Sequence, residues 1–475
     1  MIFICQSKIN RDIIYLILQE LQDDKKSLYS CLTVNKTWSE IVIPILWKNP
    51  WKYLRKGNET LLLNIIILHL SNESRNKLSK YFNINSYQKP LFNYINFCKY
   101  LNLGGIERLL ISKSLININE IFKIFINENM KFTHLYIPHK FNYYFMDLIS
   151  GVEKGFSKLE FLSCNTNIND DTLIGLVEIC KSIKELELYV EPCNNNDEII
   201  KLIDSPKKLI NIRFLTKPYS SNDELFCGIL ENSFIKHANH LQYFKITKQP
   251  TTKILSSFIN LKSLELYDNS RPMSWNCLEN LSLPYLQILK ATGIPIKVLT
   301  SLIDHTNGHL IEIKIDHISH NEISNKKIIQ TIYKKCPNLE YLKLLFINNN
   351  ILELRELLIN CNHLIGLYII FEDVWDVNVM IDYNIIFKIL SDNSSISLFK
   401  LKFYYHREPE LKSFEFFFDN WKIRIPMRPI LLQTIQYHVL YGSEHFDLIE
   451  KYKKNGIVKK YENALSENTF QDFEW

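Results

Sequence analysis

The chain has 475 residues, of which 46% are hydrophobic, and a formal net charge of +5. Its length exceeds what one hydrophobic core supports, so we expect several domains or a repeat array instead of a single compact domain. The small net charge does not predict nucleic-acid binding, and we regard a nucleic-acid partner as unlikely.

The longest apolar run, residues 61–70, is about half a membrane span and contains Asn64 and His69. The first twelve residues lack the order of a signal peptide. The ten cysteines are scattered and include no Cys-x-x-Cys pair, which favours a reduced compartment over a disulfide framework. We therefore expect a protein of the cytoplasm, the nucleus or both, without a membrane partner.

Residues 9–50 predict three short helices. Apolar residues recur at helical spacing between residues 9 and 21, Asp24 is placed to cap a second helix, and a third contains Trp38 and Ile41. Pro44 is expected to end or restart this third helix. A unit this small is marginal alone, so its surplus apolar stripe needs a partner or the next domain to cover it. From periodicity alone, a plain helical segment packed on the rest of the chain fits equally well.

The apolar residues of this unit resemble the F-box motif. VNKTW at 34–38 and PILW at 44–47 match its Val-Cys-x-x-Trp and Pro-x-Leu-Trp segments, whereas Ile9–Asn10 stands where the motif has Leu-Pro. The string at 22–38 is also similar to the expanded F-box families of mycorrhizal fungi. The resemblance implies an F-box over residues 1–50 that binds a Skp1-type adaptor; another role for Trp38 and Trp47 is to hold the unit together. The residues that the resemblance implies in adaptor binding are Ile9, Ile13, Ile14, Ile17, Leu21, Leu28, Leu32, Val34, Trp38, Ile41, Leu46 and Trp47.

Residues 51–103 predict a helical connector. The run 61–70 is a candidate buried helix, and Ser71 is placed to cap a short helix after it. Pro90 suits the start of a further helix with an apolar face that extends to Leu101.

From residue 104 a six-residue pattern recurs, apolar at its first, fourth and sixth positions. Its mean spacing is (398−106)/11, about 26.5 residues, with single steps from 20 to 34, and leucine-rich repeats span about 20–29. The pattern begins at Ile106, Phe132, Leu159, Ile183, Leu209, Leu241, Leu261, Leu286, Leu310, Leu339, Leu364 and Leu398.

Three predicted helices between these segments end at Cys180, Cys336 and Cys361, each three residues before the next apolar position. This arrangement resembles the cysteine-containing leucine-rich repeat. We therefore predict an α/β fold in which the helical F-box precedes a leucine-rich-repeat solenoid over 104–445, with parallel strands inside and helices outside. LKSFEF from Leu411 and LQTIQY from Leu432 are expected as atypical strands, and residues 446–475 as a cap and acidic tail.

The sequence contains no phosphate-binding loop, HExxH zinc pair or GxSxG elbow. His317 and His320 are close in sequence, as are His134 and His139, but no cysteine or carboxylate pattern completes a metal site around them. We expect no catalytic residues, metal or cofactor.

Positions two, four and six residues after each first apolar position should line the inner face of the solenoid. They carry several lysines and tyrosines, and the lysines predict a positive ridge for an acidic or phosphorylated target segment. The other interpretation is a solvated polar face in a lysine-rich protein. The residues assigned to target binding are Lys245, Tyr267, Lys290, Lys314, Tyr341, Lys343, Tyr368 and Lys402.

The F-box resemblance implies the substrate-recognition subunit of a Skp1–cullin–F-box ubiquitin ligase. The partners would be a Skp1-type adaptor, through it a cullin, and an unknown protein target. Two alternatives remain open: an adaptor-bound scaffold without ubiquitination, and a stand-alone binding module whose N-terminal helices cap the solenoid. An enzyme is the least favoured reading.

Overall fold

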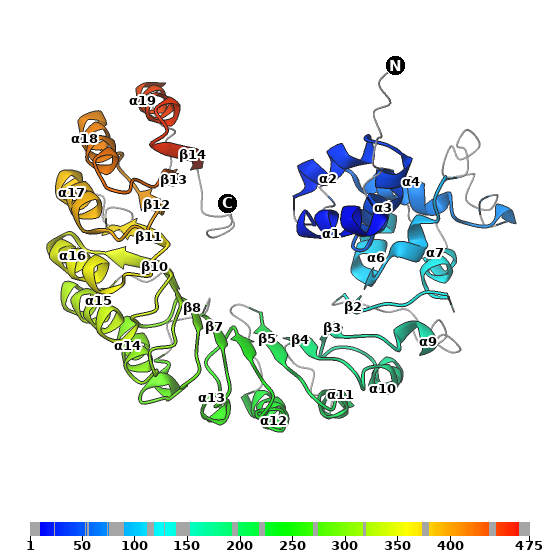
Figure 1. The fold of residues 1–475 in the computed structure, drawn as a ribbon. Coiled ribbons are helices and arrows are strands. Elements are labelled where there is room, and N and C mark those ends of the chain that lie inside the picture. Colours follow the sequence, from blue (N-terminus) through cyan, green and yellow to red (C-terminus); the bar gives the residue numbers. More distant parts are fainter. Residues whose placement is uncertain are drawn as a thin grey trace, which may run out of the picture. The chain divides into compact units, whose positions relative to one another are not determined.

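The fold was obtained as a computed structural model (Figure 1). Contacts within the chain divide it into two compact units, residues 1–209 and 210–475. The structure describes residues 10–22, 24–52, 54, 57–73, 75, 90–111, 118–127, 129–138, 153–191, 198–217, 224–268, 274–316, 320–372, 380–436 and 443–464.

The first unit begins with three helices, each capped by a side chain at its N-terminus. Asn10, Asp24 and Asn35 accept hydrogen bonds from backbone amides in the first turns of α1, α2 and α3, which satisfies donors that a helix start leaves unpaired. Pro44 neither ends nor restarts α3, because the helix continues through it to Trp47. The helices are α1 (Arg11–Glu20), α2 (Lys25–Leu32) and α3 (Lys36–Trp47).

The three helices share a small core. It consists of Ile14, Leu18, Leu28, Ile41 and Val42, all at most 5% exposed. An ion pair of 3.1 Å between Arg11 and Glu40 also joins α1 to α3. The helices therefore form a packed unit.

The connector departs from its prediction. Helix α4 (Glu59–Ile67) occupies most of the predicted run 61–70, but the helix predicted from Pro90 is only the short η2 (Tyr94–Phe97). Strand β1 (Tyr100–Asn102) follows at once and is fixed to the turn after α3 by a 2.8 Å hydrogen bond from Trp51 Nε1 to the Tyr100 carbonyl. The repeats therefore begin before residue 104.

Residues 106–111, predicted as the first strand, lie instead in helix α6 (Leu103–Ile111). Leu103, Ile106 and Leu109 recur every three residues and are all buried, so the six-residue pattern at this place is one face of a helix. The remaining elements of the first unit are α7 (Ile118–Phe125), β2 (His134–Tyr136), α9 (Glu153–Phe156), β3 (Phe161–Asn165), α10 (Asp170–Ile179), β4 (Glu185–Val190) and α11 (Glu198–Asp204).

Parallel pairing joins β1 to β2, β2 to β3 and β3 to β4 in chain order. The second unit continues the same plan, with strands β5 to β14 in chain order, and Figure 1 shows these strands on the inner side of an arc with the helices outside. Its strands are β5 (Asn211–Thr216), β6 (Tyr243–Ile246), β7 (Ser263–Tyr267), β8 (Ile288–Thr292), β9 (Glu312–Asp316), β10 (Tyr341–Phe346), β11 (Gly366–Phe371), β12 (Lys400–Tyr405), β13 (Ile430–Gln436) and β14 (Val458–Ala464).

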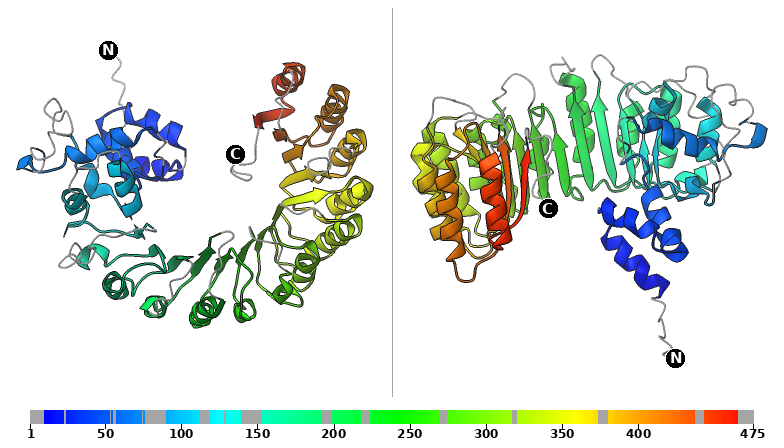
Figure 2. Two further views of the ribbon diagram at one scale, coloured as in Figure 1. Left: turned by 180° about the vertical axis from the view of Figure 1, so that it is seen from behind. Right: turned by 90° about the horizontal axis from the view of Figure 1, so that it is seen from above.

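The helical elements of the second unit alternate with these strands, and Figure 2 shows them from two further sides. Of the twelve predicted strand positions, only that at Ile106 is wrong; each of the others precedes a strand by two residues. The helical elements are α12 (Glu224–Ile235), α13 (Ile254–Ser257), η3 (Asn276–Leu278), α14 (Ile296–Asp304), α15 (Glu322–Lys335), η4 (Asn348–Asn350), α16 (Ile351–Asn360), α17 (Tyr383–Asn393), α18 (Leu411–Lys422) and α19 (Ser443–Lys454).

Two predictions near the C-terminus are corrected. LKSFEF from Leu411 is the start of helix α18, whose Phe414, Phe417, Phe418 and Trp421 lie at helical spacing and are fully buried. The predicted cap beyond residue 445 contains a further strand, β14, paired in parallel with β13. LQTIQY from Leu432 does lie in a strand, β13. Residues 465–475 of the predicted tail lie outside the described residues.

The three helix-terminal cysteines are where the sequence placed them. The backbone amides of Cys180, Cys336 and Cys361 each donate to the carbonyl four residues earlier. Their carbonyls then accept from the amide three residues later, at 3.1–3.2 Å. A small buried apolar side chain suits this turn from helix to strand.

The buried cysteine thiols, Cys164 on β3 and Cys361 after α16 among them, should be unreactive in the folded chain. Burial raises the pKa of Cys361 to about 12 and that of Cys164 to about 12, so both remain protonated at about pH 8, whereas a free thiol is partly ionised there. We expect Cys164 and Cys361 to resist iodoacetamide under native conditions and to react after denaturation. Peptide mass spectrometry measures this, with the partly buried Cys31 as the internal control; native labelling of Cys361 at the rate of Cys31 would contradict the packing described.

Candidate protein-binding surfaces

Helix α1 has apolar side chains on its exposed side as well as in the core. Ile13, Leu16 and Ile17 are 51%, 61% and 44% exposed and lie at i, i+3 and i+4, on one face of the helix. Ile14 and Leu18 point into the core. We call Ile13, Leu16 and Ile17 the α1 apolar face; Tyr15, Tyr29 and Val34 of the same unit are 46%, 55% and 56% exposed.

The structure divides the residues that the F-box resemblance assigned to adaptor binding. Ile13, Ile17 and Val34 are exposed. Trp47 packs against Tyr94, with ring centroids 4.8 Å apart, and Ile9 lies outside the described residues. The members of the helical core, or of the layer packed on it, are Ile14, Leu21, Leu28, Leu32, Trp38, Ile41 and Leu46.

Sequence reasoning missed Tyr15, Leu16 and Tyr29 as exposed apolar residues. A signal was available, because residues 13–18 form an unbroken apolar run of six. Six consecutive residues cover the full circumference of a helix, so they cannot all face one core. Part of the run had to remain on the surface.

The inner face of β6–β10 carries an alternating set of charges, not the positive ridge predicted from the lysines. Lys245 lies 3.2 Å from Glu265, and Lys290 lies 3.6 Å from both Glu265 and Glu312. Glu312 is also 3.0 Å from Lys314. Cross-strand pairs of opposite charge stabilise the sheet, and they neutralise much of the expected potential. We call these five residues the charge ladder.

The charge ladder continues at Lys343, which lies 2.5 Å from Asp316. Of the lysines assigned to target binding, Lys245 and Lys290 keep side chains 34% and 39% exposed. Lys314 and Lys343 are 8% and 3% exposed. Of these four lysines, Lys245 and Lys290 are therefore the ones accessible to a partner on this face.

The pKa of Glu265 reports the strength of this pairing. Burial raises that pKa, but Lys245, Lys290 and a hydrogen bond from Tyr243 together outweigh burial, and the net shift is downward from 4.5. A carboxyl with a depressed folded pKa contributes stability that is present above the unfolded pKa and is lost as the pH falls through the folded value.

We expect the double variant K245S/K290S to reverse this contribution. Burial, the largest single influence on this carboxyl, then opposes only the hydrogen bond from Tyr243, so we expect the pKa of Glu265 to rise and its ionised form to destabilise the fold. The difference in unfolding temperature between wild type and variant should grow as the pH rises from about 3 to about 6. K327S/K388S, which replaces exposed outer lysines, is the control; a difference independent of pH would contradict the ladder.

The inner face of β10–β13 is itself packed. Leu345, Tyr368, Ile370 and Ile435 form a buried cluster there. The ammonium groups of Lys343 and Lys402 lie 4.4 and 5.2 Å from the centroid of the Tyr368 ring, within cation–π range. Tyr368 is 1% and Lys402 0% exposed, so neither is accessible to a target in this conformation.

The two remaining tyrosines of the target-binding set are half-buried. Tyr267 belongs to β7, beside the charge ladder, and Tyr341 lies under Lys400, whose ammonium is 5.3 Å from its ring centroid.

In the first unit the inner face carries a row of rings instead of lysines. His134 stacks on Tyr100 at 3.8 Å and on Phe161 at 5.3 Å between centroids. Burial lowers the pKa of His134, although Glu185 and Glu160 oppose that shift. A second ring, Tyr136, packs on Phe161. The row is structural, because His134 is packed between the rings of Tyr100 and Phe161.

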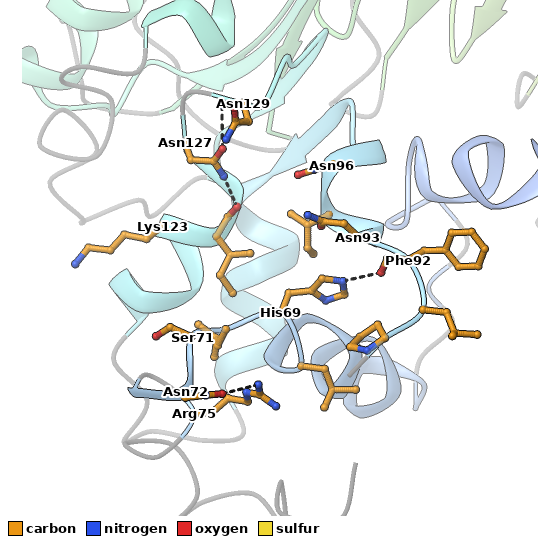
Figure 3. A pocket seen from close by; sticks show the side chains of 16 residues that line it. His69, Ser71, Asn72, Arg75, Phe92, Asn93, Asn96, Lys123, Asn127 and Asn129 are labelled. Carbon is orange, nitrogen blue, oxygen red and sulfur yellow. Dashed lines mark hydrogen bonds between the residues drawn. The ribbon is translucent and has the colours of Figure 1, made fainter. Parts of the chain in front are cut away.

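A hollow of about 1070 Å³ lies between the end of α4, residues 90–96 and α7 (Figure 3). Its only imidazole among the described lining residues, His69, has Nδ1 2.8 Å from the Ile65 carbonyl oxygen. The Nε2 atom is 3.2 Å from the Tyr94 amide and 3.3 Å from the Phe92 carbonyl oxygen. His69 therefore holds the segment to α4, and the hollow gains no catalytic group from it.

Within the described ranges, no three His, Cys, Asp or Glu side chains come together as metal ligands. His139 and His317 fall outside those ranges. None of the helices that the structure describes has the length and apolar character needed to cross a membrane.

No protein-family model matches this chain, and no curated protein matches it in sequence.

Proposed function

We propose that this protein is the substrate-recognition subunit of a Skp1–cullin–F-box ubiquitin ligase. Its N-terminal helices would bind a Skp1-type adaptor, which links to a cullin, and its repeats would bind the target. Such a subunit performs no chemistry, since it acts by raising the concentration of a target near the enzyme that carries ubiquitin.

The α1 apolar face is the observation that carries the proposal. Ile13, Leu16 and Ile17 expose between 44% and 61% of their surface on a helix that is capped and packed. Exposed apolar residues grouped on one helix face favour a protein interface. The F-box resemblance of residues 34–38 and 44–47 supports a Skp1-type adaptor as the partner of this face.

The repeats support the second half of the proposal. A solenoid presents one long inner face, on which each strand contributes alternate side chains. Accessible lysines and tyrosines on β6–β8 supply polar and aromatic contacts suited to a protein segment.

The test is capture of a recombinant Skp1-type adaptor by the full chain and by the chain without residues 1–50. We expect binding by the full chain only. Affinity purification with mass spectrometry would then identify targets, and their cullin-dependent turnover would separate a ligase subunit from a scaffold. Equal adaptor capture by both proteins would refute the proposal, and a chain that captures targets without any adaptor would be a stand-alone binding module.

Target capture should depend on the accessible end of the charge ladder. In K245S/K290S we expect weaker capture of the identified target, by roughly tenfold, and a flatter dependence on salt. Adaptor binding should be unchanged. If K245S/K290S and K327S/K388S capture the target equally at low and high salt, the ladder is only a solvated face.

A further inference from the structure

Three neighbouring connections form one surface on the second unit. They lead from α17 to β12, from α18 to β13 and from α19 to β14, and the parallel pairing of these strands places their N-terminal ends at one edge of the sheet. We call residues 394–400, 420–430 and 453–460 at this edge the basic edge.

Hydrogen bonds join the three connections. Arg424 Nη2 donates to the carbonyls of Ser394 and Ser395 at 2.8 and 2.7 Å. The Ile430 amide donates to the Ile457 carbonyl at 2.8 Å. The basic edge is therefore a continuous surface.

Every charged residue of the basic edge is a cation. The three segments contain eight Lys or Arg and no Asp or Glu. Among the described residues, Lys453 pairs with Glu450 and Lys460 with Glu462. Lys422, Lys454 and Lys459 are exposed and form no ion pair within the described part of the chain. Neighbouring positive charge also affects Lys400. Burial lowers the pKa of Lys400, and the nearby Arg428 lowers it further.

Exposed isoleucines stand among these cations. Ile396, Ile423 and Ile425 are 51%, 71% and 97% exposed. The same edge continues with apolar tips in the turns before β7 and β8, where Ile259 and Tyr285 are 51% and 55% exposed. Exposed apolar side chains that gather on one surface favour an interaction site there, whereas single ones are ordinary.

Contacts of Trp421, Arg424 and Arg428 hold the connection from α18 to β13, which carries Ile423 and Ile425. The Arg424 guanidinium lies 3.9 Å from the centroid of the Trp421 ring, and Trp421 Nε1 donates to the Arg428 carbonyl at 2.9 Å. Arg428 in turn lies 3.4 Å from the centroid of the Phe399 ring. Preorganisation of this kind lowers the entropic cost of binding.

We propose that the basic edge docks on an anionic lipid surface. Cations gain favourable energy near acidic headgroups, and aliphatic tips enter the boundary between headgroups and acyl chains. Ile425, at 97% exposed, projects outward and does not line a groove that a peptide could fill. The exposed apolar residues of the basic edge, in its first two connections, are the aliphatic Ile396, Ile423 and Ile425, whereas single-stranded nucleic acid is bound by stacking on aromatic rings.

The test is sedimentation of the full-length chain with vesicles of phosphatidylcholine containing 30% phosphatidylserine, compared with pure phosphatidylcholine vesicles. We expect binding to the anionic vesicles only, weakened by salt. The variant K422Q/K454Q/K459Q should lose about fivefold in affinity for each lysine, or roughly 100-fold in total. I423S/I425S should lose roughly tenfold.

Matched controls separate this edge from the rest of the surface. K327Q/K388Q/K412Q removes three exposed lysines from helices, and I323S/L352S removes exposed apolar residues from the first turns of α15 and α16. Both should bind vesicles as the wild type does, and unchanged circular-dichroism melting would show that all variants fold. Absence of binding to the anionic vesicles, equal loss in the controls, or retention on heparin without vesicle binding would each overturn the proposal. Adaptor capture is a separate measurement, so failure here leaves the proposed ligase function untouched.

Discussion

Replacing Ile13 and Ile17 by lysine is expected to abolish capture of a Skp1-type adaptor without unfolding the protein. The two side chains are 51% and 44% exposed, so their loss removes little from the helical core. At the centre of an interface, each such residue typically contributes about 2 kcal/mol to binding. The double variant should therefore weaken the adaptor complex by about 4 kcal/mol, or roughly 1,000-fold.

Lysine is a suitable replacement because it favours the helix about as well as isoleucine does. Adaptor affinity is measured by calorimetry or by surface-immobilised adaptor, and helix content by circular dichroism. I174K/I323K, which replaces isoleucines that are 55% and 78% exposed elsewhere, should bind like the wild type. Unchanged adaptor affinity in I13K/I17K would show that the α1 apolar face is not the adaptor site.

Among single substitutions of charged residues in the second unit, replacement of Glu231 by alanine is expected to cause the largest loss of stability. Glu231, on α12, is 1% exposed. Its carboxylate accepts hydrogen bonds from the Thr251 amide at 3.0 Å, the Thr252 amide at 2.7 Å and the Thr252 hydroxyl at 2.5 Å. It thereby ties α12 to the segment that leads into α13 of the next repeat.

Alanine would leave two backbone amides without their acceptor and open a small cavity, at a cost of about 3 kcal/mol. E231Q keeps the shape and one acceptor oxygen, so it should lose about half as much. Hydrogen exchange of the amides at residues 249–256 localises the effect, and urea unfolding gives its size. E356A removes an exposed carboxylate and should change stability by less than about 0.5 kcal/mol; an equal loss in E231A and E356A would contradict the role of Glu231.

Local chemistry was readable from the sequence because it depends on near neighbours. Asp24 caps α2, as its position before the helix predicted, and the helices before Cys180, Cys336 and Cys361 end at those residues. A cap and a helix end are decided within about four residues. The strand spacing was also readable, since each repeat has to bury the same apolar positions.

The two wrong strand assignments share one cause. The segments from Ile106 and from Leu411 both have apolar residues at the first, fourth and sixth positions, and spacing of three fits a helix as well as this strand pattern. The neighbouring residues decided the outcome: Leu103 extends the apolar face of α6 backwards, and Phe417, Phe418 and Trp421 extend that of α18 forwards.

The sequence by itself determined the alternation of strands and helices, the cysteine turns and the apolar excess of residues 13–18, because each follows from periodicity or from contacts within one repeat. Only the tertiary structure decided which apolar residues of α1 are exposed, since that depends on which face of α1 packs against α2 and α3. It also decided that Lys290 lies between Glu265 and Glu312, and that Tyr368 and Lys402 are buried. Charge pairing and burial on the inner face depend on which residues the parallel register brings side by side, and register joins residues about one repeat apart in the chain.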